Sequence, residues 1–329
     1  MALPALLISA LMGGLVGYLS FERFAFETSS KLGSSGVDLA DFFPDPEAPP
    51  GEFVGLKHVR NNLWELTVYS PSIQRNITND LVLTEGGGQH RAAPYFLPPP
   101  AREAARPTSS ETSSSTWSRR AARSVLSRRA GRRGPTLGLD TWTTYLTKEL
   151  PSLIGAQFHG TGHDAIAGMS VSGGAALHIA TLEERFKVAG TYSSRQSTTG
   201  ALGQAFASST ARFCGADPKN LWGSSADPAW AAHSPVLHLD DMRGLTLFAA
   251  ASRGVPADTD EPVKDSAAPL LVVDKQFAYT CTRCFVDQAR YAGLDVDVYE
   301  FNEGTRDWGL FRRQLPATRV TIGRALGVE

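Results

Sequence analysis

A serine among small residues lies in the middle of the chain, in Gly168-Met169-Ser170-Val171-Ser172. A short apolar run precedes it, and an alanine- and glycine-rich stretch with apolar residues at helical spacing follows. A strand, a tight turn and a helix in this order are typical of a nucleophile elbow, which raises the serine hydroxyl above a sheet edge. The N–H of Val171 would face the same position as an oxyanion donor. The pattern predicts that Ser170 attacks a carbonyl carbon.

The second half of the chain predicts the elements that would position this serine. Apolar runs predict buried strands at 186–192, 245–251 and 296–301, and helical spacing predicts helices at 199–211, 276–292 and 308–326. Strands that alternate with helices favour a parallel sheet covered on both faces.

The first half predicts antiparallel strands at 63–71 and 76–83, where apolar and polar residues alternate before a glycine-rich turn at 85–89. A third strand is expected at 92–97, ending at Pro98-Pro99-Pro100, and a helix at 139–150. The fold class is therefore α/β, a mostly parallel central sheet with helices on both faces and antiparallel first strands.

Residues 102–133 differ from the rest, with nine arginines, no lysine and two acids. Three interpretations stay open: a basic tether for anionic lipid or polymer, a disordered loop, or a shifted reading frame of GC-rich DNA. Because this stretch, part of an irregular segment at 98–133, lacks periodicity and large apolar residues, we predict that it packs poorly and lies outside the sheet.

Residues 2–21 form one uncharged apolar run that could just span a bilayer. We expect residues 1–25 to be a transmembrane anchor or export signal, 26–54 a proline-rich linker, and 55–329 the folded domain. The chain would then be exported and either membrane-anchored or secreted. A wrongly chosen start codon and a buried helix are the alternatives.

Composition excludes several classes of protein. A net charge of −1 argues against a general nucleic-acid binder, and three cysteines are too few for a disulfide scaffold. The Cys281–Cys284 pair and the His159–His163 pair lack the further ligands of a metal site. We expect no metal and no cofactor, and core positions for Trp64, Trp142, Trp222 and Trp230.

Five segments carry a family resemblance: Leu63–Pro71, Leu146–Pro151, Ala167–Ser170, the pair Leu221-Trp222-Gly223 and Asp227-Pro228-Ala229-Trp230, and Gly304-Thr305 before Trp308. Together they resemble the actinobacterial mycolyltransferases and esterases, the antigen 85 relatives with an α/β-hydrolase fold. Such proteins pass an acyl group, often a mycolate, from an ester or glycolipid to trehalose or another cell-envelope glycan.

The resemblance implies Ser170 as nucleophile, Val171 as an oxyanion donor and Asp274 as the acid after an apolar run. The family's histidine position is occupied by Arg306, and no histidine follows the acid. Arginine stays protonated and cannot accept the serine proton, so we expect negligible turnover. The arginine-rich segment also replaces the strand that carries the second oxyanion donor. The rival hypothesis is a non-catalytic glycolipid- or polysaccharide-binding protein of the cell envelope.

Overall fold

The computed structural model describes residues 44–83, 92–97, 116–118, 142–213, 217–258, 268–305 and 308–327. These residues build one sheet, in the order β1-β2-β3-β5-β4-β6-β7-β8-β9. The strands are β1 (Glu52–Arg60), β2 (Leu63–Ser70), β3 (Arg75–Val82), β4 (Pro94–Leu97), β5 (Thr116–Ser118), β6 (Asp164–Met169), β7 (Phe186–Tyr192), β8 (Thr246–Val255) and β9 (Val296–Glu303).

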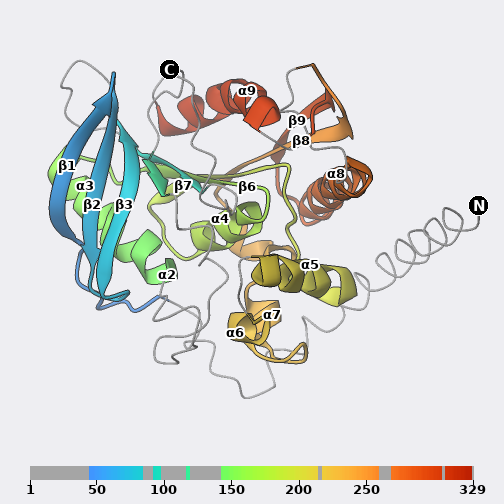
Figure 1. Cartoon of the computed structure of the whole chain (residues 1–329), viewed down its shortest axis with the longest axis horizontal. Coiled ribbons are helices and arrows are strands. Elements are labelled where there is room, and N and C mark those ends of the chain that lie inside the picture. Colours follow the sequence, from blue (N-terminus) through green and yellow to red (C-terminus); the bar gives the residue numbers. More distant parts are fainter. Residues whose placement is uncertain are drawn as a thin grey trace, which may run out of the picture.

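The described helices lie on both faces of the sheet (Figure 1). They are α2 (Trp142–Thr144), the π-helical η3 (Tyr145–Glu149), α3 (Leu150–Phe158), α4 (Ser172–Thr181), α5 (Gly200–Phe213), α6 (Lys219–Trp222), α7 (Ala229–Ala232), the 3₁₀ turns η4 (Pro235–Leu237) and η5 (Asp240–Met242), α8 (Ala268–Tyr291) and α9 (Trp308–Leu326).

The strand directions confirm the expected α/β-hydrolase architecture. Strands β1, β2 and β3 pair antiparallel, whereas β4, β6, β7, β8 and β9 pair parallel. The carboxyl ends of the parallel strands therefore meet at one edge of the sheet, where open α/β sheets bind their ligands. Strand β1 begins at Glu52, inside the segment expected to be linker up to residue 54.

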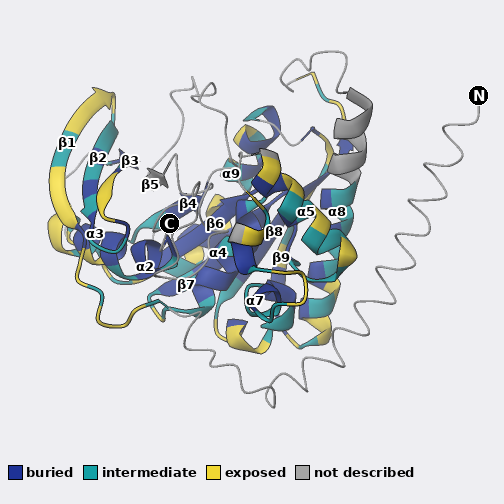
Figure 2. Cartoon of the chain, turned by 60° about the horizontal axis from the view of Figure 1, so that its bottom comes forward, coloured by how far each residue is buried: buried dark blue, intermediate teal, exposed yellow. Residues whose placement is uncertain are grey.

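Two apolar cores form because side chains alternate across the sheet. In β8, Leu247 and Ala249 face the core that contains α3, α4 and α8, whereas Phe248 and Ala250 face the core under α9. Strand β6 is buried at every position, which explains its continuous apolar run. Figure 2 shows this buried centre between the covering helices.

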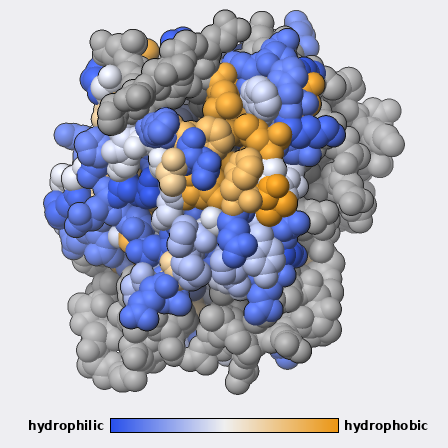
Figure 3. Space-filling model, turned by 90° about the vertical axis from the view of Figure 1, so that its left-hand side faces the viewer, coloured by the Kyte–Doolittle hydropathy of each residue, from blue (hydrophilic) through white to orange (hydrophobic). Residues whose placement is uncertain are grey.

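Strand β1 forms an exposed edge of the sheet. Phe53, Val54 and Val59 are exposed there, and the side of the molecule that carries β1 shows an apolar patch among hydrophilic side chains (Figure 3). The register with β2 shifts between Phe53 and Gly55 and again between His58 and Arg60. Such bulges interrupt the hydrogen-bonding edge and discourage strand addition.

Two expectations about local structure are wrong. Thr116–Ser118, within the arginine-rich segment, forms β5 between β3 and β4, so this segment does not lie wholly outside the sheet. Threonine and tryptophan favour strands, and β5 supplies backbone partners to both neighbours. The apolar run at 270–273, which would place Asp274 just beyond a strand end if it formed a strand, lies in α8 instead, since this helix begins at Ala268.

The apolar residues 2–21 lie outside the described part of the chain, so the anchor stays a prediction. Among the residues that the structure describes, no helix is both long and apolar enough to cross a bilayer.

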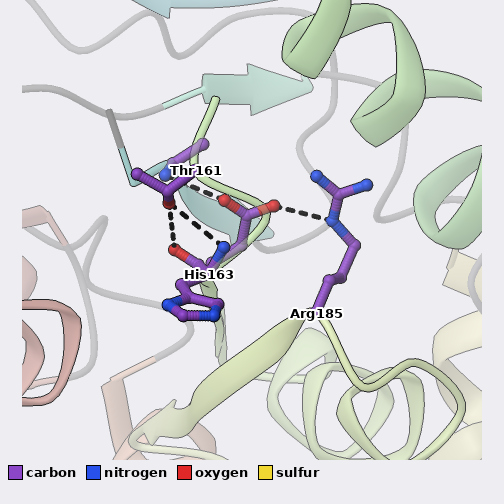
Figure 4. Close-up of polar contacts among 5 residues, drawn as sticks. Thr161, His163 and Arg185 are labelled. Carbon is purple, nitrogen blue, oxygen red and sulfur yellow. Dashed lines mark hydrogen bonds and ion pairs between the residues drawn. The ribbon is translucent and has the colours of Figure 1, made fainter. Parts of the chain in front are cut away.

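A largely buried ion pair holds the start of β6 against the start of β7, and a hydrogen bond ties it to the residue before β4. Asp164 accepts hydrogen bonds from Arg185 Nε at 2.7 Å and from the backbone N–H of Ala93 at 3.0 Å (Figure 4). The Asp164 side chain is 2% exposed. Burial raises the pKa of this carboxyl group, and Arg185 opposes the rise. The pair therefore joins the consecutive strands β6 and β7, and the Ala93 hydrogen bond adds β4, which is distant in sequence.

Removing one partner of this pair should destabilise the fold strongly. We expect Arg185→Ala to lower the free energy of unfolding by about 3 kcal/mol, because it leaves the Asp164 carboxylate buried and without its cation. Arg243→Ala is the matched control, since the Arg243–Asp240 pair is exposed and should contribute under about 1 kcal/mol. Urea denaturation of both variants measures the difference. Equal losses would show that the buried pair has no special role.

Candidate active site

Ser170 forms the tip of a strained turn between β6 and α4. Its φ is +57°, in the left-handed region that non-glycine residues seldom adopt. The backbone N–H of Ser170 donates to the Tyr192 carbonyl oxygen at 2.9 Å, which ties the turn to the end of β7. The residue is 8% exposed. This geometry is that of the predicted nucleophile elbow.

Two glycines make the elbow sterically possible. A Cβ at Gly168 would lie 2.0 Å from the carbonyl oxygen of Ser172, which is fixed backbone. A Cβ at Gly173 would lie 2.0 Å from Ser194 Oγ. The tight approach therefore requires glycine at 168 and 173, whereas position 172 accepts a buried serine. Backbone strain that the surroundings enforce in this way is typical of functional sites.

The loop after β7 supports the elbow from one side. Ser194 Oγ donates to the carbonyl oxygen of Ser170 at 2.5 Å. Thr282 of α8 in turn donates to the Ser194 carbonyl oxygen at 3.3 Å, and Gln314 of α9 donates to Ser193 Oγ at 3.2 Å. The turn is thus braced by helices from both faces of the sheet. Sequence reasoning missed these residues, because serines after a strand carry no distinctive pattern.

Val171 is the N-cap residue of α4, so its backbone N–H lies at the N-terminus of this helix. Backbone N–H groups at such an end have no acceptor inside the helix and are oriented to receive negative charge. Val171 is therefore positioned as the predicted oxyanion donor. The segment after β4, where a second donor would lie, falls outside the described residues.

The predicted acid, Asp274, does not follow a strand. Asp274 lies within α8 rather than after a strand, and its side chain is outside the described part of the chain. Strand β8 ends at Val255, and the first acid beyond it is Asp258, which is exposed. Because β6 and β8 are parallel members of one sheet, Asp258 follows the same edge as Ser170. It is the better candidate for the acid, and the predicted strand at 245–251 could have indicated it.

The loop after β9 carries Arg306, which stands at the position of the family's histidine. Gly304 has a φ of +124°, and its carbonyl oxygen accepts a hydrogen bond from Ser252 Oγ at 2.9 Å. This places the loop that leads to Arg306 at the same sheet edge, but Arg306 itself is outside the described residues. Among the residues that the structure does describe, none forms a hydrogen bond with the Ser170 hydroxyl. If Arg306 and Asp274 take the family's histidine and acid positions, we expect them to form an ion pair, and this pairing remains a prediction.

Other predicted groups take structural roles. Trp142, Trp222 and Trp230 are buried, in agreement with core positions. Cys281 and Cys284 lie on α8, where Cys281 is buried and Cys284 is half-buried. Among the described residues, no group of three or more His, Cys, Asp or Glu side chains is arranged to hold a metal ion.

The elbow and the parallel sheet define the class: an α/β-hydrolase with a serine at the nucleophile position. The family described as "putative esterase" matches residues 128–322, more than half of the chain. The protein therefore belongs to this esterase family, whose chemistry is acyl ester hydrolysis or transfer.

Curated relatives agree with this assignment. The chain is 28% identical over 195 residues to the diacylglycerol acyltransferase/mycolyltransferase Ag85B of Mycobacterium avium. That match spans 57% of this chain and 57% of the relative, so it covers little more than half of the relative's length. The resemblance to mycolyltransferases is confirmed at this level.

Solved structures show the same fold at low sequence identity. A ferulic acid esterase matches with a TM-score of 0.52 and 15% identity over 80% of this chain and 98% of its own. An S-formylglutathione hydrolase from Agrobacterium tumefaciens matches with a TM-score of 0.53 and 12% identity, over 83% of this chain and all of its own.

Proposed function

We propose that the protein transfers or hydrolyses an acyl ester through an acyl-enzyme on Ser170, and that Arg306 makes this reaction slow in the chain as it stands. The ester carbon would be attacked by Ser170 Oγ while the Val171 N–H holds the developing oxyanion. The single observation that carries the proposal is the left-handed serine at +57° between β6 and α4. A solvated structural serine would not require the two constrained glycines beside it.

The substrate class follows from the relatives. The name of these relatives, diacylglycerol acyltransferase/mycolyltransferase, supports an acyl donor of the mycolyl type, such as a glycolipid ester. Trehalose or another cell-envelope glycan is the proposed acceptor. We also propose that residues 1–25 hold the protein at the cell envelope or direct its export. Recovery of the full-length chain from the cytosolic fraction would contradict that location.

A non-catalytic glycolipid- or polysaccharide-binding protein is the second candidate. The observation that favours it is the arginine at the family's histidine position, because Arg306 cannot accept a proton from Ser170. Such a protein would keep the fold and lose the activated nucleophile.

Fluorophosphonate labelling distinguishes the two candidates. We expect the protein to label at Ser170, slowly, because the strained turn presents the hydroxyl but no base activates it. Ser170→Ala is the direct control, and Ser172→Ala, two residues away, is the matched one. Intact-mass and peptide analysis locate the adduct. Absence of label at Ser170 over many hours, with glycolipid binding retained, would favour the binding protein.

A further inference from the structure

The last helix, α9, carries a positive charge that no acid of the same helix balances. Its charged residues are Arg312, Arg313, Arg319 and Arg324. Among the helices that the structure describes, α9 alone holds more than two charged residues of one sign and none of the other. The whole chain has a net charge of −1, so this excess belongs to the helix and not to the protein in general.

Helical spacing gathers the charge on the outward side of α9. The exposed residues of the helix are Arg312, Pro316, Arg319, Val320 and Arg324. At about 100° per residue, these five positions fall within an arc of about 140°. The opposite side carries Phe311 and Ile322, which are buried in the core under α9. Figure 1 shows α9 as an outer layer on one face of the sheet.

Ordinary structural roles explain only part of this charge. Arg313 is half-buried and donates to the carbonyl oxygen of Glu303 at 2.8 Å, which holds the end of β9. Arg324 lies in the last turn, where the helix dipole favours a cation. Arg312 lies in the second turn and Arg319 in the middle of the helix, where the dipole offers a cation no advantage. These exposed arginines therefore call for a partner outside the helix.

The neighbouring strand does not neutralise the exposed arginines. Asp297 of β9 accepts a hydrogen bond from Thr321 of α9 at 2.5 Å. Within the part of the chain that the structure describes, neither Arg319 nor Arg324 forms an ion pair. Guanidinium groups match phosphate oxygens in geometry and charge, so the chemistry that fits this side of the helix is a phosphate-bearing anion.

The length of the exposed arc selects an extended anion over a small one. Arg312 and Arg324 are twelve residues apart, which is about 18 Å along the helix. A single phosphate group reaches only one of them, whereas a charged surface reaches both. Val320 lies between them and is 59% exposed. An apolar side chain among arginines suits the interface of a lipid bilayer better than a fully hydrated polyanion.

The position of α9 also suits a bilayer. The helix begins at Trp308, directly after the loop that carries Arg306, and this loop lies at the sheet edge of Ser170. A bilayer along α9 would therefore lie next to the edge at which an acyl lipid reaches the serine.

We propose that the exposed arc of α9 docks on the anionic surface of a lipid bilayer, with Arg312, Arg319 and Arg324 on headgroup phosphates and Val320 at the boundary to the acyl chains. The choice of a bilayer rests on the proposed acyl-lipid function. The contact itself requires no turnover at Ser170, so it can be tested separately.

The test maps lipid contacts on the full-length protein. Vesicles of equal parts phosphatidylcholine and phosphatidylglycerol carry a trace of phosphatidylglycerol with a diazirine near its headgroup. After illumination, glutamyl endopeptidase releases residues 304–329 as one peptide, because no glutamate lies between Glu303 and Glu329. We expect lipid adducts within 312–324. The peptide 262–300, which includes Tyr291 at 88% exposure, is the internal control and should carry few. Absence of adducts on α9, or equal yield on pure phosphatidylcholine, would overturn the proposal.

Two double variants test whether the position of the charge matters. Arg319→Gln with Arg324→Gln should lower the adduct yield on α9 by about 25-fold, since each arginine near an anionic surface contributes about fivefold. Arg212→Gln with Arg243→Gln removes the same charge at exposed positions outside α9 and should stay within about twofold of the parent. Equal losses in both would show a general charge effect and refute docking by α9.

Two further measurements separate the alternatives. Polyphosphate at the phosphate concentration of the vesicles should compete weakly; complete loss of the α9 adducts would identify a soluble polyanion as the partner and overturn the bilayer. Fluorophosphonate labelling of Ser170 without lipid reports on the proposed function alone. A labelled serine without α9 adducts refutes only the docking, and α9 adducts without label refute only the acyl-enzyme. The parent protein gives both results, so a variant that fails to fold leaves neither undecided.

Discussion

Arg306→His is expected to raise kcat/KM for a short-chain nitrophenyl ester on the order of 1,000-fold. The elbow already supplies the nucleophile and one oxyanion donor, and what the chain lacks is a group that accepts the serine proton. The loss of one triad member typically lowers the rate by several powers of ten, so its return should recover a comparable factor. The parent protein should show no turnover above Ser170→Ala.

Two controls test this prediction, one at Arg306 and one at Ser170. Arg306→Gln removes the charge without providing a base and should give no gain. Ser170→Ala in the histidine background should abolish the gain. Turnover by the unaltered protein that Ser170→Ala removes would show that Arg306 does not inactivate the site. No gain from Arg306→His would indicate that the segment at 98–133 lacks the second oxyanion donor.

The Arg306→His variant can also be used to identify the acid of the catalytic triad. Asp258 follows β8 at the sheet edge that carries Ser170, whereas Asp274 lies inside α8. Asp258→Asn should therefore remove most of the gained activity, on the order of 10³-fold or more, because an amide cannot hold the histidine in its productive tautomer. Asp274→Asn should change it little. The opposite result would return the role to Asp274.

The elbow could be predicted because its residues are constrained locally. Gly168 is required by contact with Ser172, four residues away, and Gly173 by contact with the loop after the next strand. The contact between Gly168 and Ser172 lies within one turn of the chain, so its requirement for glycine is visible in the sequence as a short motif. The parallel strands were predictable for a related reason: each is buried on both faces, which gives an uninterrupted apolar run.

The acid and the bracing residues could not be predicted in the same way. Residues 270–273 are apolar enough for a strand, but they lie in α8, and the sheet position that follows β7 is filled by β8. A short apolar run does not distinguish a strand from a buried helix. Ser194 and Gln314 act through contacts between segments distant in the sequence, so no spacing reveals them.

The histidine cluster near α4 should make the fold sensitive to mild acid. Burial lowers the pKa of His233 to about 4 and lowers that of His178 in the same direction. In the unfolded chain both rings take up protons near their ordinary pKa of about 6.5. The stabilisation from keeping them neutral is therefore present above about pH 6.5 and is lost progressively as the pH falls toward the folded-state values.

The charged groups around these rings do not offset the effect. The ring of His238 lies 6.2 Å from that of His178 and brings no negative charge. Arg195, which lines the same cavity as His178 and His233, carries a positive charge. Asp241, the acid 3.2 Å from His238 Nδ1, is exposed, so solvent screens its charge. Protonation of His178 or His233 therefore places a second positive charge near Arg195 at a partly buried site, and this destabilises the folded state.

We expect the free energy of unfolding to fall by about 1–2 kcal/mol between pH 7.5 and pH 5 from His233 alone, with a further loss from His178. Urea denaturation at several pH values measures this slope. His178→Phe should flatten the curve, since an apolar ring has no proton to take up, and it should cost little at pH 7.5 because no hydrogen bond is removed. His163→Gln, at an exposed position, should leave the slope unchanged. A parent protein equally stable at pH 7.5 and pH 5 would contradict the argument, because two buried neutral imidazoles cannot be protonated without cost.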